Sequence, residues 1–332
     1  MEKFLPTVCY FPTTVLLIDD DRRYLDGLAQ ELDAKKAYYR KFYDPRGILD
    51  FFAGYNSNSF AKRCIIRQEE ERLEHRTLDI DVRSIHREAN NGKRFTEVAV
   101  IIVDYAMPYM NGLELCKLLK QQPCKKLLLT GEADETLAVR AFNDGLIDKF
   151  IRKDSSHFKL ALNQAVQDLQ KQYFHQASAT LVNALTTDMV QPAVFLTDKI
   201  FMDFFEELMQ KLNATEFYLM DSEGSFMLLD LYGNPSWLAM KNEKAMQSLT
   251  EFAKYDATPT AVMQALQERH KIPYFHTEDE LQTPACEWQP FLHAARKLEG
   301  KDTYYYAIIT NRKFSVNEKI FSFMEYCQKI AY

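Results

Sequence analysis

The sequence predicts an α/β protein with a five-stranded, doubly wound parallel sheet, followed by a second domain of the α+β class. Short apolar runs alternate with helical patterns through the first half of the chain. This alternation is typical of parallel strands that are covered by helices on both faces. The second half instead shows strands in hairpin arrangements, which favours an antiparallel sheet. A chain of 332 residues is long enough for two domains with separate cores.

The elements of the first half follow one another in a regular order. Tyr24, Leu25, Leu28 and Leu32 follow the first strand at helical spacing, which is typical of positions that face a core. Asp44-Pro45 is typical of an N-cap followed by the first residue of a helix. Gly145 marks the end of the last of these helices. Strands are expected over 14–18, 37–43, 98–103, 126–129 and 147–151, and further helices over 46–52, 113–120 and 135–143.

Residues 56–97 interrupt this alternation. They combine many charges with scattered apolar residues, which predicts one or two amphipathic helices inserted into the first domain. The charge run 68–76 is typical of a solvated helical face, and a partner-binding surface is the alternative.

A long helix is expected from 155 to about 186, ending before Pro192. It is interpreted as a signalling connector with its first half packed and its second half free, or paired in a dimer. The expected division is a first domain over 1–154 with its insertion at 56–97, a connector over 155–190, and an output domain over 191–332. The order of elements in the output domain suggests an outline like that of PAS or GAF domains. Its helices are expected over 201–212, 243–255, 260–270 and 317–330, and its strands over 216–220, 225–231, 235–240, 289–298 and 302–310.

Composition excludes several classes of protein. The net charge is −6, and residues 191–332 hold 14 Lys and Arg against 20 Asp and Glu. This balance gives no general attraction for nucleic acid, although a local basic patch stays open. The 6 cysteines show no CxxC spacing, which indicates reduced thiols and disfavours zinc. No apolar run is long enough to span a bilayer and no secretory signal is evident, so a cytoplasmic protein is expected.

Polar side chains follow four of the five predicted strands: Asp19 with Asp20, Asp104, Thr130 and Lys153. The carboxyl ends of parallel strands meet at one edge of a sheet, where ligands bind. Three carboxylates there would repel one another unless a cation lay among them, and oxygen ligands suit Mg²⁺ or Mn²⁺. A carboxylate beside such a metal can accept a phosphoryl group. Lys153 would then supply a second cation to the phosphoryl oxygens, and Thr130 a hydroxyl donor.

The run from Asp104 to Leu115, Asp-Tyr-Ala-Met-Pro-Tyr-Met-Asn-Gly-Leu-Glu-Leu, resembles response-regulator receiver domains, the flavodoxin-like (CheY-like) modules of two-component signalling. The resemblance covers about residues 13–160. This sequence departs from the family at Asp154, where a proline usually follows the lysine. Without that proline, the position of Lys153 stays open. The resemblance implies these roles: acidic metal pair Asp19 and Asp20, phosphoacceptor Asp104, metal-binding carbonyl Ala106, switch hydroxyl Thr130, switch aromatic Phe150 and phosphate-contacting Lys153.

The function expected from this resemblance is a phosphorylation-controlled switch. A partner histidine kinase would phosphorylate Asp104, and the new charge would change dimerisation and output contacts. The elongated receiver and the segments 130–135 and 150–153 are also similar to LqsR-like quorum-sensing response regulators, which implies a homodimer. No catalytic motif is found in the output domain, so an enzyme is not expected. The alternative is a regulated module in which 191–332 binds a nucleotide, nucleic acid or small signal.

Overall fold

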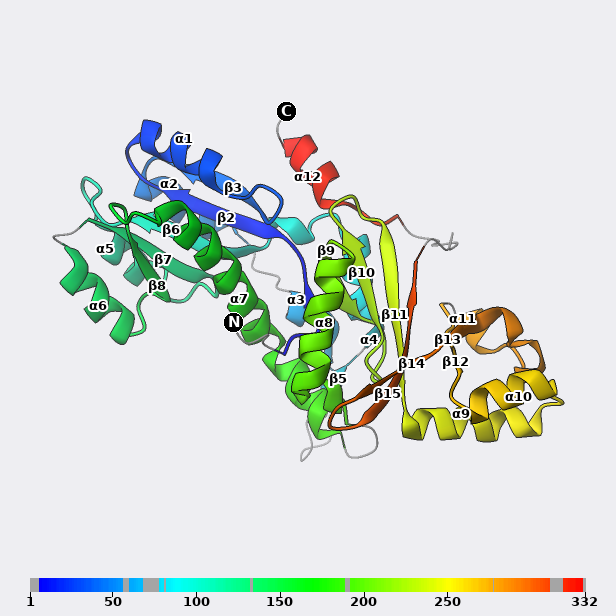
Figure 1. The fold of residues 1–332 in the computed structure, drawn as a ribbon. Helices are drawn as coiled ribbons and strands as arrows, with labels where there is room; N and C mark the ends of the chain where they lie inside the picture. The colour runs from blue at the N-terminus through cyan, green and yellow to red at the C-terminus, as the bar shows by residue number, and fades with distance from the viewer. Residues whose placement is uncertain are drawn as a thin grey trace. The chain divides into compact units, whose positions relative to one another are not determined.

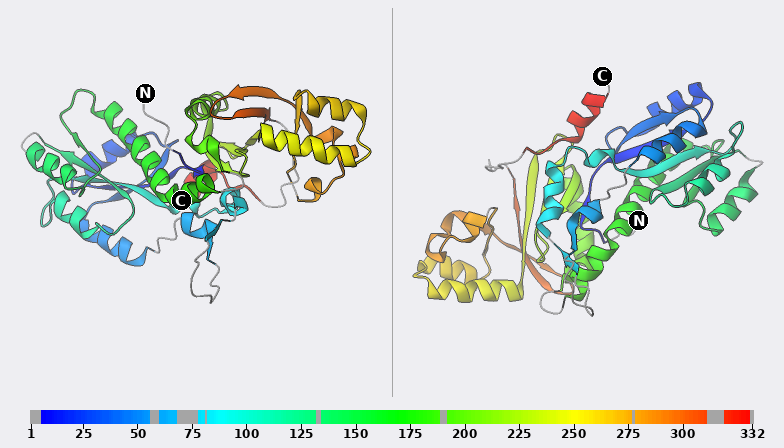
Figure 2. Two further views of the ribbon diagram at one scale, coloured as in Figure 1. Left: turned by 90° about the horizontal axis from the view of Figure 1, so that it is seen from below. Right: turned by 180° about the vertical axis from the view of Figure 1, so that it is seen from behind.

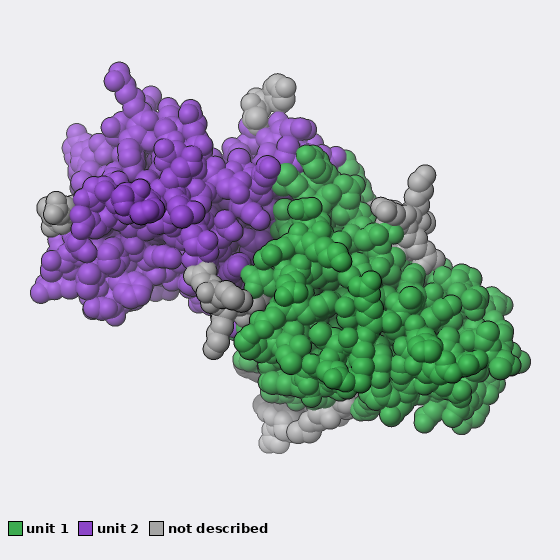
Figure 3. Space-filling view, viewed as in Figure 1, with its two compact units in different colours: residues 1–9, 64–90, 179–321 green, residues 10–63, 91–178, 322–332 purple. Residues whose placement is uncertain are grey.

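The computed structural model divides into two compact units (Figure 3). Unit 1 contains residues 1–9, 64–90 and 179–321, and unit 2 contains residues 10–63, 91–178 and 322–332. This division differs from the expected boundaries, because both units are assembled from separate stretches of the chain. The structure describes residues 6–55, 60–67, 78–80, 82–131, 134–188, 192–276, 278–310 and 319–330.

Unit 2 contains the predicted five-stranded sheet, and all of its strand pairs are parallel. The strands lie in the order β3-β2-β6-β7-β8 (Figure 1). The central strands β2 and β6 are buried along their whole length, as their runs of Val, Ile and Leu require. The strands are β2 (Thr13–Ile18), β3 (Ala37–Phe42), β6 (Val98–Asp104), β7 (Lys125–Thr130) and β8 (Lys149–Arg152).

Helices cover both faces of this sheet (Figure 2). The starts of α1, α2 and α5 are fixed by side chains that accept otherwise unpaired backbone N–H groups. Asp21 accepts from the N–H groups of Arg23 and Tyr24. Asn111 and Glu114 form a reciprocal capping box directly after the Asp104 loop. These helices are α1 (Arg22–Glu31), α2 (Pro45–Gly54), α5 (Gly112–Leu118) and α6 (Glu135–Asn143).

The long helix α7 (Phe158–Thr187) matches the expected connector in length. Its first half is buried at Leu162, Val166, Leu169 and Tyr173. The expectation that its second half is free is wrong, because Leu181, Val182 and Leu185 are also buried. The apolar spacing therefore continues past the polar Gln176 that made the second half look exposed.

The insertion contains two short helices, as expected, and a pair of strands that was not predicted. β4 (Ile65–Arg67) pairs antiparallel with β5 (Leu78–Ile80). The β-branched pair Ile65-Ile66 favours a strand, although the neighbouring charges suggested a helix. The charge run 68–76 lies outside the described residues. The other elements of this region are α3 (Phe60–Cys64), α4 (Val82–Arg87), and the 3₁₀ helices η1 (Glu88–Asn90) and η2 (Arg94–Thr96).

Unit 1 is built on a six-stranded sheet in the order β1-β9-β10-β11-β15-β14. Neighbouring strands from β9 to β14 pair antiparallel, as the hairpin pattern predicted. The strand expected over 289–298 is wrong as a single element. Pro290 lies in a short 3₁₀ helix, η6 (Gln289–Phe291), and two short strands follow it. The strands are β1 (Cys9–Tyr10), β9 (Ala214–Leu219), β10 (Phe226–Asp230), β11 (Pro235–Asn242), β14 (Arg296–Glu299) and β15 (Thr303–Ile309), with β12 (Lys271–Pro273) and β13 (Leu292–Ala294) in a separate pair.

Aromatic side chains form much of the core of unit 1. Phe205 lies against Phe226, with ring centroids 4.6 Å apart, and against Phe217 at 5.1 Å. Phe201 stacks on Phe205 from the preceding turn of the same helix. The core is therefore formed where α8 (Lys199–Lys211) packs on β9 and β10 of the six-stranded sheet. The helical elements are α8 (Lys199–Lys211), α9 (Glu243–Tyr255), α10 (Thr260–Gln267) and α11 (Glu278–Leu281), with the 3₁₀ helices η4 (Val194–Thr197) and η5 (Ala285–Glu287).

The last described helix, α12 (Phe323–Ile330), belongs to unit 2 and not to the output domain in which it was expected. Phe323 is fully buried, with its ring 5.2 Å from that of Phe95. Tyr326 packs edge-on against Tyr38 at 5.7 Å, and its hydroxyl lies 3.4 Å from the hydroxyl of Thr14. Apolar spacing predicted a helix here, but spacing does not show which core a helix completes. In the described part of the chain, no helix is both long and apolar enough to cross a membrane.

Candidate functional site

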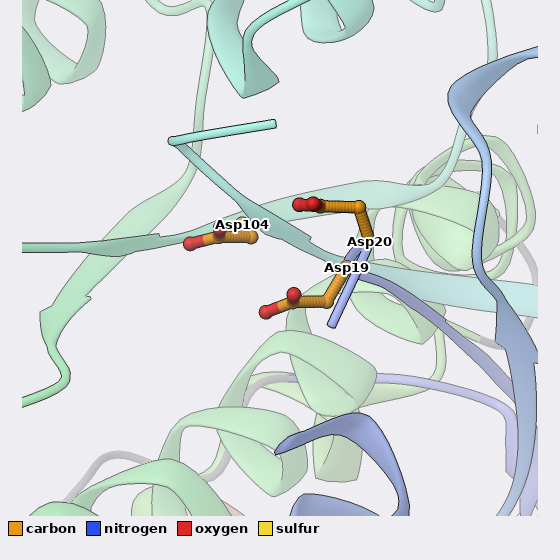
Figure 4. A group of neighbouring side chains, drawn as sticks. All are labelled: Asp19, Asp20 and Asp104. Atoms are coloured by element: carbon orange, nitrogen blue, oxygen red, sulfur yellow. The ribbon is translucent and has the colours of Figure 1, made fainter. Parts of the chain in front are cut away.

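Three carboxylates lie together at the carboxyl edge of the parallel sheet. Asp19 and Asp20 directly follow β2, and Asp104 is the last residue of β6. Each offers an oxygen atom that lies within 4.8 Å of those of the other two. Figure 4 shows the three carboxyl groups turned to the same side. Oxygen ligands of an octahedral Mg²⁺ lie up to roughly 4.2 Å apart, so this donor set fits a hard divalent cation with little rearrangement.

Two of the carboxylates are buried, whereas Asp20 is exposed. Burial raises the pKa of Asp19, although the N–H of Asp21 and the ammonium of Lys153 both donate to it and act in the opposite direction. The raised pKa means that the ionised form of Asp19 is poorly compensated in the protein alone. A bound cation would supply the missing compensation.

Lys153 places its ammonium between the buried carboxylates. Its Nζ lies 3.0 Å from Oδ2 of Asp19 and 2.8 Å from Oδ1 of Asp104. Burial acts to lower the pKa of Lys153, but the hydrogen bonds to Asp104 and Asp19 outweigh it and the pKa is raised. The backbone N–H of Lys153 donates to the carbonyl of Thr130 at 2.9 Å, which ties the end of β8 to the end of β7.

Asp154, which stands where a proline was expected, points to its neighbour Arg152. The guanidinium of Arg152 forms a fork with this carboxylate, with Nε 3.0 Å from Oδ1 and Nη2 2.7 Å from Oδ2. It also reaches Glu135, in the first turn of α6, at 3.3 Å. These groups are partly exposed, so the pairs stabilise the turn only weakly.

Thr130 lies at the end of β7 and is fully buried. Its hydroxyl forms no hydrogen bond with any described residue. A buried hydroxyl without a partner is unfavourable, so this hydroxyl has an unused capacity to donate.

We expect Thr130→Val to raise the free energy of unfolding by about 1 kcal/mol, because it removes an unsatisfied donor. Chemical denaturation of the full chain measures this. Thr14→Val is the matched control, since the Thr14 hydroxyl donates to the carbonyl of Phe95 at 2.8 Å and its loss should destabilise the protein. A lower stability for Thr130→Val would show that the hydroxyl already has a partner.

The two remaining predicted site residues lie near this edge. Ala106 is exposed in the loop after β6, two residues beyond Asp104. Phe150 is half-buried on β8, with its ring 6.4 Å from that of Phe142. Phe150 also lines a surface groove of about 620 Å³ together with Arg152, Ser155 and Gln164. The roles of Ala106 and Phe150 stay predictions.

Two neighbours of the site were missed as functional residues. The ring of Tyr24 lies 4.0 Å from Nζ of Lys153, although its spacing suggested only a core position. A Cβ added to Gly112 would lie 2.3 Å from the carbonyl oxygen of Asp104. The Asn111-Gly112 pair indicated a turn, but no sequence signal showed how closely the start of α5 approaches Asp104.

Comparison with known proteins agrees with this fold. The family model of the response regulator receiver domain matches residues 63–165, a stretch that contains Asp104, Thr130 and Lys153 and begins after Asp19 and Asp20. A solved structure of the response regulator LqsR from Legionella pneumophila is 34% identical and covers 99% of this chain and 97% of its own, with a TM-score of 0.81. None of the curated proteins compared with the chain matches it.

Two other solved structures resemble about half of the chain. An adenylate cyclase structure from Rhodopirellula baltica is 18% identical over 53% of this chain and 99% of its own, with a TM-score of 0.35. A response regulator receiver domain protein from Clostridium thermocellum is 16% identical over 51% of this chain and 98% of its own, with a TM-score of 0.34.

The fold and the family model define a response regulator with a receiver domain. The chain belongs to the same family of response regulators as LqsR, which it matches along nearly its whole length.

Proposed function

We propose that this protein is a two-component response regulator that a partner histidine kinase phosphorylates on Asp104. The observation that carries this proposal is the cluster of three carboxylates within 4.8 Å of one another, two of which share the ammonium of Lys153. Asp19, Asp20 and Asp104, with the carbonyl of Ala106, would hold Mg²⁺ or Mn²⁺. When bound, this metal neutralises charge on the transferring phosphoryl group.

In the transfer step, a carboxylate oxygen of Asp104 attacks the phosphorus atom of a phosphohistidine on the kinase. The new O–P bond forms as the P–N bond breaks, and the electron pair of that bond remains on the imidazole. Lys153 already lies 2.8 Å from Asp104, so its ammonium is in place to stabilise the phosphoryl oxygens. Asp19, which shares this ammonium, keeps it at the edge of the sheet.

The phosphoryl group then provides the acceptor that the hydroxyl of Thr130 lacks among the described residues. Movement of Thr130 toward it opens space near β8, where we propose that Phe150 responds. The resulting change of surface alters dimerisation and output-domain contacts. We further propose that this switch acts as a homodimer in a cytoplasmic quorum-sensing circuit, and the similarity to LqsR supports this proposal.

Intact-mass measurement after incubation with Mg²⁺ and acetyl phosphate tests the proposal. The wild-type chain should gain one phosphoryl group, and Asp104→Asn should gain none. Asp44→Asn is the control, because Asp44 caps α2 and is not one of the three clustered carboxylates. Chelation of the metal should also abolish the gain. An equal gain on Asp104→Asn would show that another residue is the acceptor.

A further inference from the structure

Lys153 makes a third contact besides its two ion pairs, and the phosphorylation chemistry above does not account for it. The aromatic ring of Tyr24 lies with its centroid 4.0 Å from Nζ of Lys153. Tyr24 is in the first turn of α1, four residues after Asp20. The cap that Asp21 provides includes the N–H of Tyr24, at 3.1 Å, so the backbone of this residue is fixed by the start of the helix.

The hydroxyl of Tyr24 does not explain why a tyrosine occupies this place. Its oxygen is buried and forms no hydrogen bond with the described residues. Burial raises the pKa of Tyr24 to about 12, so the ring is neutral at ordinary pH. The contact that remains is that between the ring and the ammonium, and a half-buried cation–π contact of this kind is favourable.

The ammonium needs support because the backbone after it gives little. The Arg152 fork on Asp154 is exposed and holds the turn weakly. The long side chain of Lys153 also has many rotamers available, and fixing one of them is entropically unfavourable. The ring of Tyr24 and the two carboxylates all contact Nζ, so together they favour the rotamer of Lys153 that reaches all three.

We infer that Tyr24 is a positioning residue that holds the ammonium of Lys153 through its aromatic ring and so promotes phosphorylation of Asp104. The expected effect on the phosphorylation rate rests on the proposed function. The expected effect on Mg²⁺ binding rests only on the contacts of Lys153. The ring acts through Lys153 and has no role of its own in the transfer.

The inference has two consequences of opposite sign. Loss of the ring should slow phosphorylation, because Lys153 no longer waits in the position that stabilises the phosphoryl oxygens. The same loss should strengthen Mg²⁺ binding. In the wild type the ammonium of Lys153 pairs with Asp19 and Asp104 and competes with the metal for both carboxylates. Without the ring the ammonium is held there less firmly, so it competes less. If Tyr24 only stabilised α1, its loss would lower both the phosphorylation rate and the affinity for Mg²⁺, because Asp19 and Asp20 lead into that helix.

The experiment uses the full chain with Mg²⁺ and acetyl phosphate, followed over time by intact mass, and titration calorimetry with Mg²⁺ alone. Tyr24→Leu should lower the phosphorylation rate about two- to thirtyfold, the range expected for a cation–π contact of this burial. It should also bind Mg²⁺ more tightly than the wild type. Tyr24→Phe keeps the ring and should restore both values.

Tyr43→Leu is the matched control. It removes another ring that lies under a cation, that of Arg22 at 5.0 Å, and should change neither measurement. In a Lys153→Met background, Tyr24→Leu should no longer alter the affinity for Mg²⁺, because the ammonium that the ring holds is gone.

Three results would overturn the inference: a wild-type rate for Tyr24→Leu, an equal loss in Tyr24→Phe, or weaker Mg²⁺ binding by Tyr24→Leu. Failure of the wild type to gain a phosphoryl group is different, since it contradicts the proposed function. In that case the Mg²⁺ titrations with and without Lys153 still test the role of Tyr24.

Discussion

Replacement of Gly112 by alanine is expected to destabilise unit 2 by about 3 kcal/mol or more, the upper range for forcing an atom into a packed site. The added Cβ would lie 2.3 Å from the carbonyl oxygen of Asp104 and 2.9 Å from Cδ1 of Leu128. The carbonyl is backbone, so no side-chain rotation relieves the clash. Either the start of α5 or the end of β6 must move, and both segments flank Asp104, the proposed phosphoacceptor.

Hydrogen exchange of the β6 amides, followed by mass spectrometry, measures this effect in the full chain, and exchange should be faster in Gly112→Ala. Phosphorylation by acetyl phosphate should fall in the same variant. Gly27→Ala is the matched control, because an added Cβ at Gly27 in α1 meets no atom within 4 Å. That variant should gain up to about 1 kcal/mol from better helix propensity. Wild-type exchange in Gly112→Ala would contradict the close approach of α5 to Asp104.

The second large effect is expected at the C-terminal helix. Phe323→Ala should lower the stability of unit 2 by about 3–5 kcal/mol, the usual cost of truncating a buried phenylalanine. Phe323 is fully buried, and its ring lies 5.2 Å from that of Phe95, just before β6. The cavity would therefore open in the core that supports the strand carrying Asp104.

Chemical denaturation with hydrogen exchange of β2 and β6 tests this prediction. Ile330→Ala is the control, since Ile330 is in the same helix and 42% of its surface is exposed. It should change stability much less. Equal, small effects of both variants would show that α12 does not complete the core of unit 2.

The parallel sheet could be predicted from the sequence because its physical cause is local. Buried strands need continuous apolar residues, and the run Val98–Val103 has no other simple explanation. The candidate site followed from one further rule, that parallel strands present their carboxyl ends at one edge. That rule was enough to bring Asp19, Asp104 and Lys153 together without any knowledge of distances.

The rest depended on contacts between residues far apart in the chain. The apolar spacing of 317–330 indicated a helix, but not that Phe323 packs against Phe95. Tyr24 looked like a core residue because a helical stripe does not show what faces each ring. The β4–β5 pair was missed because two strands of three residues each are too short for a periodic signal.

The position of α12 also has a consequence for biosynthesis. Strands β2 to β8 are translated early, yet the buried ring that Phe323 contributes to their unit comes from the far end of the sequence. Domains usually fold as units while the chain is being made, beginning with the N-terminal one. Here the core of unit 2 lacks the ring of Phe323 until all of unit 1 has been synthesised. A nascent chain that stalls within unit 1 would therefore present an immature receiver, and chaperone binding to such stalled chains should decrease once α12 emerges.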